Sequence, residues 1–256
     1  MVCSDVLLIA HRGESHDAPE NTLASVKLAW ERNADAVEID VQQSKDGEIV
    51  VIHDSNTWRT GGVKREVRDQ TLEELRILDM GKHKGDHWAL ERIPTFREVL
   101  ETVPRGKRLF VEIKCGPEII PELKTILEKA LLFPDQVTFI GLELTTMSAL
   151  KKHFPGHEVC WVCDMERDAE KDAWEPGVDE MVAKALETGI DGLDVFACEA
   201  VDKSFVRKVK ASGMKLYVWT VNDPAEARRL CEAGVDGITT DRPHWLRTKL
   251  RPSEAS

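Results

Sequence analysis

Residues 6–13 read VLLIAHRG, an apolar run that ends in a histidine, an arginine and a glycine. Three later stretches end in a similar way: AVEID (36–40), IVVIHD (49–54) and LFVEIK (109–114). Short runs rich in Val and Ile are typical of buried parallel strands. Charged side chains at the carboxyl end of such strands do not serve packing, and α/β proteins bind ligands at that end. The sequence therefore predicts one mouth lined by two histidines, three carboxylates, an arginine and a lysine.

The rest of the chain alternates strand and helix patterns. Strand patterns occur at residues 6–10, 36–41, 109–113, 137–142, 158–163, 192–197, 215–220 and 236–240. Amphipathic helical patterns follow most of these runs, and several end in glycine. Eight strands with interleaved helices predict an α/β fold of the (β/α)8 TIM-barrel type, built as one domain over residues 1–256. A doubly wound open sheet is the alternative.

One irregularity follows the second strand. Asp46-Gly47 is a hairpin turn signal, which predicts an extra strand at 48–52 that ends at His53. Residues 55–108 then form a long connection, with a short helix over 71–78 and another from about Pro94. We expect this small insertion, approximately 55–108, to cap the mouth.

Composition narrows the class of protein. The net charge of −11 argues against a nucleic-acid binder, because such a protein needs a basic face. No apolar run reaches the roughly 20 residues of a membrane span, and the first residues lack the basic region of a signal peptide. These features predict a cytoplasmic protein. Cys160 and Cys163 lie three apart on a strand pattern, so their side chains face opposite ways, which favours packing over redox or zinc chemistry.

Paired charges on two strands suggest a cation site. Glu38 and Asp40 are two apart on a strand, so they point to one side, and hard oxygen ligands select Mg²⁺, Ca²⁺ or Mn²⁺. The alternative is a solvated strand end with two acids. Glu112 would supply a third ligand, and Lys114 on the same side would pair with a phosphate oxygen. The alternative for this second pair is an internal ion pair that supports the barrel.

Two histidines provide acid–base potential at the same mouth. His11 and His53 each follow an apolar strand, and one can accept a proton while the other donates one. Arg12 offers a planar fork to a phosphate group. Trp219, at the end of a strand, lines a substrate pocket or caps the core. This set of residues suits metal-assisted attack on a phosphate.

Taken together, the motifs resemble those of the glycerophosphodiester phosphodiesterase family. The matching motifs are HRG (11–13), PENT (19–22), EID (38–40), DG (46–47), HD (53–54), EIK (112–114), WTVN (219–222) and DRP (241–243). They occur in the family's order and cover nearly the whole chain. The resemblance implies a TIM barrel that hydrolyses glycerophosphodiesters to sn-glycerol 3-phosphate and an alcohol.

The resemblance also implies roles for these residues. The metal ligands would be Glu38, Asp40 and Glu112, the acid–base pair His11 and His53, the phosphate-binding groups Arg12 and Lys114, and the supporting groups Glu20 and Asn21. The cofactor would be one divalent metal, Mg²⁺ or Ca²⁺, with Mn²⁺ as a further candidate. The substrate would be of the glycerophosphocholine or glycerophosphoethanolamine type. We expect a cyclic phosphate intermediate and a monomer or homodimer without nucleic-acid partners.

Other functions are weighed against this one. A lysophospholipase D or sphingomyelinase-type phosphodiesterase on the same barrel would need room for an acyl chain, whereas residues 55–108 are mostly polar. A non-catalytic binding barrel is less favoured because no expected histidine or carboxylate is missing. An amidohydrolase-type zinc enzyme is disfavoured because no His-x-His follows the first strand.

Overall fold

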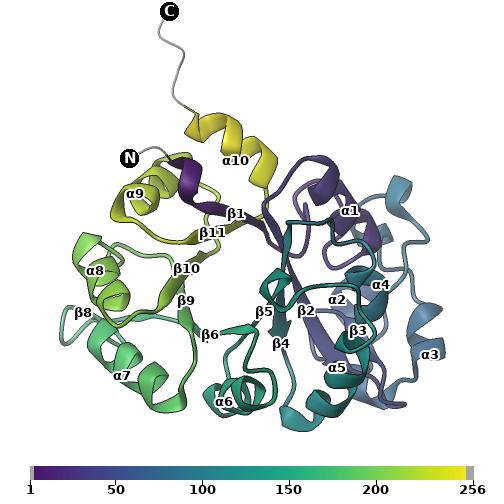
Figure 1. The fold of residues 1–256 in the computed structure, drawn as a ribbon. Coiled ribbons are helices and arrows are strands. Elements are labelled where there is room, and N and C mark those ends of the chain that lie inside the picture. The colour runs from purple at the N-terminus through teal and green to yellow at the C-terminus, as the bar shows by residue number, and fades with distance from the viewer. Residues whose placement is uncertain (1–2, 252–256) are drawn as a thin grey trace, which may run out of the picture.

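Eight parallel strands close into a barrel in the computed structural model, which describes residues 3–251 (Figure 1). The strands of the ring are β1 (Leu7–Ala10), β2 (Ala36–Gln43), β4 (Arg108–Ile113), β5 (Val137–Gly141), β6 (Glu158–Cys163), β9 (Gly192–Phe196), β10 (Lys215–Trp219) and β11 (Gly237–Thr240). Strand β1 pairs with both β11 and β2, so the ring closes. The predicted TIM barrel is confirmed, and the open sheet is wrong. Residues 1–2 and 252–256 of the predicted domain lie outside the described residues.

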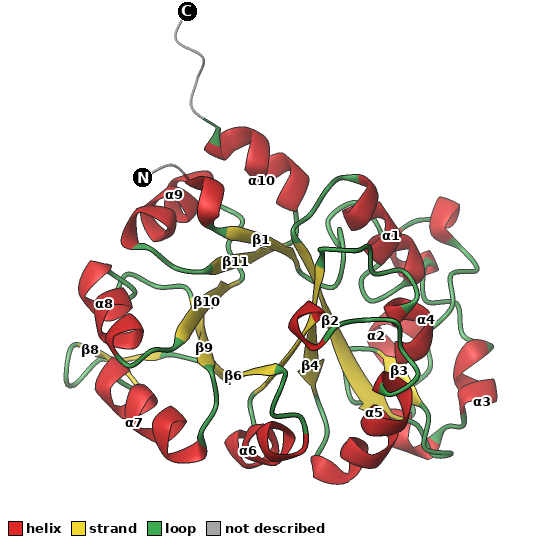
Figure 2. Cartoon of the chain, in the orientation of Figure 1, coloured by secondary structure: helices red, strands yellow, loops and turns green. Residues whose placement is uncertain are grey.

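Helices surround the strands on the outside of the ring (Figure 2). They are α1 (Leu23–Glu31), α4 (Phe96–Leu100), α5 (Ile120–Leu127), α6 (Leu144–His153), α7 (Val178–Thr188), α8 (Lys203–Ala211), α9 (Pro224–Ala233) and α10 (Pro243–Leu250). Their apolar stripes pack on the outward faces of the strands and form the main core. Each strand therefore has one apolar face under the helices and one face inside the barrel.

The barrel interior is packed with side chains and polar at its amino-terminal end. Ile9, Phe110 and Tyr217 belong to the apolar cluster inside the ring. Below them, Glu158 Oε1 accepts hydrogen bonds from Tyr217 OH and from Arg108 Nη2, each at 2.8 Å. This plug closes the bottom of the barrel, which leaves the carboxyl ends of the strands as the place for a cavity.

The predicted extra strand is present. Strand β3 (Ile49–Val51) runs antiparallel to the end of β2, with Val41 opposite Val51. The amide of Gln42 donates to the carbonyl oxygens of His53 at 3.0 Å and of Asp54 at 2.6 Å. The hairpin therefore fixes the start of the insertion next to strand β2.

The insertion has a small core of its own. It contains α2 (Trp58–Gly61) and α3 (Leu72–Arg76), and its apolar side chains, with Val67 and Leu75 among them, pack with Val50 of β3. Thr71 caps α3 through a capping box with Glu74, and the helix ends before the predicted residue 78. The helix expected from about Pro94 is α4, which begins two residues later, at Phe96.

One hairpin was not predicted. Strands β7 (Glu166–Asp168) and β8 (Ala173–Glu175) pair with each other after β6. Trp174 on β8 stacks near Phe196, and Phe196 lies edge-on to Trp219, with ring centroids 6.3 and 5.8 Å apart. The sequence of this hairpin, ERDAEKDAWE, has no alternation of apolar residues, so no strand pattern marks it.

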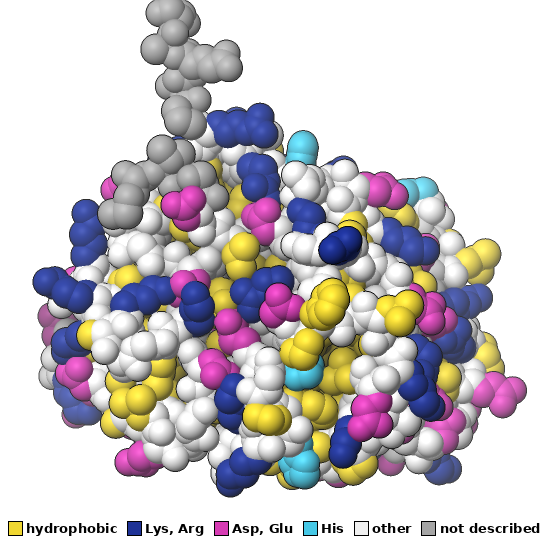
Figure 3. All heavy atoms as spheres, in the orientation of Figure 1, with side chains coloured by type: hydrophobic (Ala, Val, Ile, Leu, Met, Phe, Trp, Pro, Cys, Tyr) yellow, Lys and Arg dark blue, Asp and Glu magenta, His cyan; other side chains and the backbone are white. Residues whose placement is uncertain are grey.

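Three further predictions concern cysteines, charge and hydropathy. Cys160 faces the barrel interior and Cys163 the outer core, and both are free thiols, as the strand pattern predicts. On the face drawn in Figure 3, charges of both signs are interspersed rather than gathered into a basic surface. Among residues 3–251, no helix has the length and apolar character needed to cross a bilayer.

Candidate active site

Three carboxylates meet at the carboxyl end of the barrel. Glu38 and Asp40 come from β2, and Glu112 comes from β4, where it stands opposite Asp40 in the strand register. One oxygen from each lies within 4.8 Å of the others. Asp40 is 0% exposed and Glu38 is 3% exposed. The alternative of a solvated strand end is therefore wrong.

The electrostatics of this carboxylate cluster favour a bound cation. Burial, together with Asp40, raises the pKa of Glu38 well above its ordinary value, and burial likewise raises the pKa of Glu112. Burial also acts to raise the pKa of Asp40, but Lys114 and Arg12 outweigh it and lower that pKa. Glu38 Oε1 and Asp40 Oδ1 are buried without hydrogen-bond partners among the described residues. Oxygens of this kind are what a hard divalent cation takes as ligands, so the residues fit such an ion.

Two cationic side chains border the cluster. Lys114 Nζ lies 2.6 Å from Glu112 Oε1 and 3.2 Å from Asp40 Oδ1. Arg12 Nε lies 3.2 Å from Asp40 Oδ2, and the Arg12 backbone N–H donates to Glu38 Oε2 at 2.8 Å. The internal ion pair considered for Lys114 exists, and Lys114 and Arg12 also line the cavity.

The turn after β1 has an unusual backbone. Arg12 has φ +56° and Gly13 has φ +84°. A Cβ atom on Gly13 would approach Ser25 to 2.5 Å, so only glycine fits there. A positive φ is costly for Arg12, and such strain is found where a functional side chain has to be aimed. This turn directs Arg12 toward the carboxylates.

The supporting residues lie behind the cluster. Asn21 Nδ2 donates to Asp40 Oδ2 at 2.7 Å, and Asn21 Oδ1 accepts from the Asp40 backbone at 3.1 Å. Glu20 Oε1 accepts from Arg12 Nη1 at 2.8 Å. Glu20 and Asn21 are not among the residues that line the cavity. They therefore orient neighbours and do not face the cavity.

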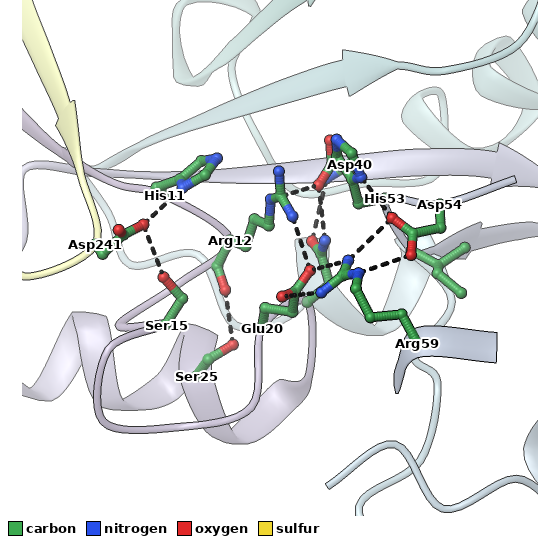
Figure 4. Close-up of polar contacts among 12 residues, drawn as sticks. His11, Arg12, Ser15, Glu20, Ser25, Asp40, His53, Asp54, Arg59 and Asp241 are labelled. Atoms are coloured by element: carbon green, nitrogen blue, oxygen red, sulfur yellow. Dashed lines mark hydrogen bonds and ion pairs between the residues drawn. The ribbon is translucent and has the colours of Figure 1, made fainter. Parts of the chain in front are cut away.

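In both histidines, the ring nitrogen Nδ1 contacts a carboxylate oxygen (Figure 4). His11 Nδ1 lies 2.7 Å from Asp241 Oδ1, and His53 Nδ1 lies 2.8 Å from Asp54 Oδ1. A carboxylate on Nδ1 fixes the ring and holds the proton there, which leaves Nε2 free to accept. Both histidines line the same cavity.

Asp241 is a site residue whose role the sequence did not indicate. Its carboxylate also accepts hydrogen bonds from Asn222 Nδ2 at 2.6 Å and Ser15 Oγ at 3.2 Å. Burial raises the pKa of Asp241, but the hydrogen bond and charge of His11, with these two donors, lower it to about 2. Asp241 directly follows β11, and this position at a strand end was the available signal.

Arg59 is the second missed residue. It comes from helix α2 in the insertion and lies between two carboxylates (Figure 4). Its Nε and Nη2 donate to Asp54 at 2.7 and 3.0 Å, and its Nη1 and Nη2 donate to Glu20 at 2.6 and 2.8 Å. The hydrogen bond from Arg59, more than that of His53, lowers the pKa of Asp54 to about 2. Nothing in the sequence near Arg59 marks this contact.

His53 lies in a mixed electrostatic environment. Burial lowers its pKa below the ordinary value, and Lys114 and Arg12 act in the same direction. Asp40 and Asp54 oppose this shift. The neutral form of His53, which can accept a proton, is therefore favoured.

A cavity of about 200 Å³ joins these groups. One side is lined by six predicted site residues: His11, Arg12, Glu38, His53, Glu112 and Lys114. The other side consists of Ile140, Leu142, Val162, Asp194, Trp219, Thr220 and Thr239. Trp219 thus lines the cavity, and its Nε1 donates to the backbone carbonyl of Asp194 at 3.0 Å. Asp194 is the third residue that the sequence did not single out.

The chain is similar in sequence to known proteins. A model of the "Glycerophosphoryl diester phosphodiesterase family" matches residues 11–245. A glycerophosphodiester phosphodiesterase of Caldanaerobacter subterraneus subsp. tengcongensis is 36% identical over 251 residues, which cover 96% of this chain and 98% of that one.

Solved structures agree with this result. A phosphodiesterase of Oleispira antarctica, solved in complex with the product sn-glycerol-3-phosphate, has a TM-score of 0.84 at 29% identity, covering 95% of this chain and 96% of that one. A glycerophosphodiester phosphodiesterase of Thermotoga maritima has a TM-score of 0.75 at 30% identity, covering 96% and 98%. The family model and the relative from Caldanaerobacter subterraneus cover nearly the whole chain, which therefore belongs to the glycerophosphoryl diester phosphodiesterase family.

Proposed function

We propose that this protein is a phosphoric diester hydrolase that converts glycerophosphodiesters to sn-glycerol 3-phosphate and an alcohol. The observation that carries the proposal is the convergence of two histidine–carboxylate pairs on one cavity beside the carboxylate cluster. The product bound in the related Oleispira antarctica enzyme supports the choice of substrate class.

Glu38, Asp40 and Glu112 would hold one divalent metal ion, with Mg²⁺ or Ca²⁺ favoured and Mn²⁺ as a further candidate. Such an ion supplies charge neutralisation at the phosphate and lowers the pKa of a nearby hydroxyl group. Glu38 Oε1 and Asp40 Oδ1, which are buried without hydrogen bonds among the described residues, support this assignment.

The chain's own residues would carry the two proton transfers. Arg12 and Lys114 bind the phosphate oxygens and hold the diester between the two imidazoles. One histidine takes the proton from a glycerol hydroxyl, whose oxygen attacks phosphorus, and the other gives a proton to the departing alcohol. This step leaves a cyclic glycerol phosphate. Water opens the ring in the second step, with the two histidines in exchanged roles. Asp241 stabilises the imidazole of His11 when it is protonated, and Asp54 does the same for His53.

The size of the cavity favours small diesters. A space of about 200 Å³, walled by Ile140, Leu142 and Val162, suits a glycerol phosphate group better than an acyl chain. Glycerophosphocholine and glycerophosphoethanolamine are therefore preferred to lysophospholipids.

We also propose that the chain forms a single domain in which residues 55–108 cap the mouth of the barrel. Arg59 of this insertion supports the proposal, because it forms ion pairs with both Glu20 and Asp54.

The test is release of sn-glycerol 3-phosphate from glycerophosphocholine and glycerophosphoethanolamine. Each reaction is run with Mg²⁺, Ca²⁺, Mn²⁺ or EDTA. We expect release that depends on a divalent metal and that EDTA abolishes. A folded protein that releases no glycerol phosphate from either substrate under any of these conditions would contradict the proposal. The same assay with lysophospholipids then tests the alternative phosphodiesterase.

A further inference from the structure

Asp194 is a buried carboxyl group that the proposed mechanism does not use. It lies on β9, which is four strands from β2 in either direction around the ring of eight (Figure 1). Its strand neighbours in register are Val162 on β6 and Tyr217 on β10. Asp194 therefore faces the carboxylate cluster across the interior of the barrel, from a largely apolar wall.

The side chain of Asp194 lacks a partner. It is 2% exposed and lines the cavity, and its Oδ1 is buried without a hydrogen bond to any residue of the range 3–251. A buried polar atom without a partner costs free energy, and nearly all such atoms in proteins are satisfied. An unsatisfied atom on the wall of a cavity is best explained by a ligand that satisfies it.

The surroundings of Asp194 indicate what kind of ligand group this is. Burial, followed by the charge of Glu112, raises the pKa of Asp194 well above its ordinary value. Its neighbours in register, Val162 and Tyr217, supply no cation that would hold it in an ion pair. A carboxyl oxygen without such a partner can form a hydrogen bond with a hydroxyl group. Asp194 lies in the middle of β9 and not at the open end of the strand, and this position suits the polyol arm of the diester better than its head group.

We propose that Asp194 binds a hydroxyl group of the glycerol arm of the substrate. The inference rests on the proposed function, since the arm that supplies the attacking hydroxyl has to lie between His11 and His53. Asp194 fixes this arm from the wall opposite the carboxylate cluster, and the head group extends toward the open mouth. Asp194 thus makes the site specific for glycerol phosphates and tolerant of different alcohols.

The test compares ligands with and without the hydroxyl groups. Dissociation constants of sn-glycerol 3-phosphate, propyl phosphate and inorganic phosphate are measured by calorimetry with Mg²⁺ present. The proteins are the wild type, Asp194→Val, which has a similar volume, and Asp194→Asn, which keeps hydrogen-bonding capacity. We expect the wild type to prefer glycerol phosphate to propyl phosphate, and Asp194→Val to reduce that preference by about 10- to 100-fold. Asp194→Asn should lie between the two, and all three proteins should bind inorganic phosphate alike.

Two results of the binding measurements would overturn the inference. One is an unchanged preference in Asp194→Val, and the other is an equal loss of affinity for all three ligands. Thermal unfolding without ligand gives a second readout: both variants should have a midpoint at or above that of the wild type, because they remove an unpaired group or replace it with a neutral one. Lower midpoints for both would show that the carboxyl group stabilises the barrel itself, which contradicts a ligand-binding role.

The activity of the wild type distinguishes a failure of this inference from a failure of the proposed function. If it releases glycerol phosphate from diesters while the variants keep the full preference, only the assignment of Asp194 fails. If it releases none, the proposed function fails before any variant is compared, and this inference fails with it.

Discussion

Nδ1 of His11 lies 2.7 Å from Oδ1 of Asp241, although the two residues are 230 positions apart in the sequence. His11 follows β1 and Asp241 follows β11, and these strands are neighbours in the closed ring. Closure of the barrel therefore supplies this histidine with its carboxylate. His53, by contrast, takes its carboxylate from the adjacent residue, Asp54.

The contact to His11 predicts the effect of Asp241→Asn. The amide preserves the shape but removes the charge that holds the Nδ1 proton and stabilises the imidazolium ion. We expect kcat for glycerophosphocholine to fall by roughly 10²-fold or more, with KM little changed. The control is Asp236→Asn, at the other end of the same barrel wall, where the carboxylate pairs with Lys210 and Lys215. Equal kcat values in the two variants would refute a role for Asp241.

Each of the two histidines should be required for activity. His11→Ala and His53→Ala each remove one of two proton transfers, so each should lower kcat by about 10²- to 10⁴-fold. Because the two residues act in one reaction, the double variant should lose much less than the product of the single effects. Steady-state kinetics give the rates, and circular dichroism confirms the fold. A normal kcat for His53→Ala would rule out the two-histidine mechanism.

Arg59 should act on both catalysis and stability. In Arg59→Met, Asp54 and Glu20 lose their shared cation, so we expect a lower kcat and a loss of about 1 kcal/mol in unfolding free energy at pH 7, since the pair is partly exposed. The folded pKa values of Asp54 and Glu20 are about 2, below the ordinary 3.9 and 4.3 of unfolded chains. The stabilisation is therefore present above roughly pH 4.5 and lost as the pH falls toward 2.

Denaturant unfolding of Arg59→Met and wild type between pH 2.5 and 7 measures this difference. Arg65→Met is the matched control, since Arg65 lies in the same insertion and pairs with the partly exposed Glu74. A difference between Arg59→Met and wild type that grows as the pH falls would contradict the ion-pair assignment.

The carboxylate cluster should make stability depend on metal. A cation that binds only the folded protein adds about 2.7 kcal/mol at 100 times its dissociation constant. Glu38→Gln should lose most of this gain, yet be at least as stable as wild type without metal, because the repulsion with Asp40 and Glu112 is reduced. Thermal scans with EDTA, Mg²⁺ and Ca²⁺ test both statements. A full metal response in Glu38→Gln would exclude Glu38 as a ligand.

Much of the fold follows from local sequence patterns. The Val- and Ile-rich runs mark all eight barrel strands to within two residues. Charged residues in or directly after these runs mark the carboxylate cluster and both histidines, although β2 continues past Glu38 and Asp40 to Gln43. The β7–β8 hairpin has no such pattern. Seven of its ten residues are charged, and its position is fixed by the packing of Trp174 on Phe196.

The site residues that the sequence analysis missed were missed for a different reason. Arg59 lies in an irregular insertion, and the contact of Asp241 depends on closure of the ring, so neither role is written in a local pattern. Asp194 is a single charge in the middle of β9 without a second charge two residues away, which is why a search for paired charges passes over it. It is nevertheless an inward position of a strand, and the alternation of GLDVF was an available signal.

The two sides of the cavity come from different parts of the chain. The carboxylate cluster, its two cations and both histidines lie between residues 11 and 114, whereas most of the opposite wall lies between residues 140 and 220. A gene of this kind can therefore acquire a new substrate by mutation or recombination between codons 140 and 220 while its first half and the codon of Asp241 are inherited unchanged. Laboratory evolution of specificity should accordingly begin with codons 140–220, since changes there leave the reacting groups in place.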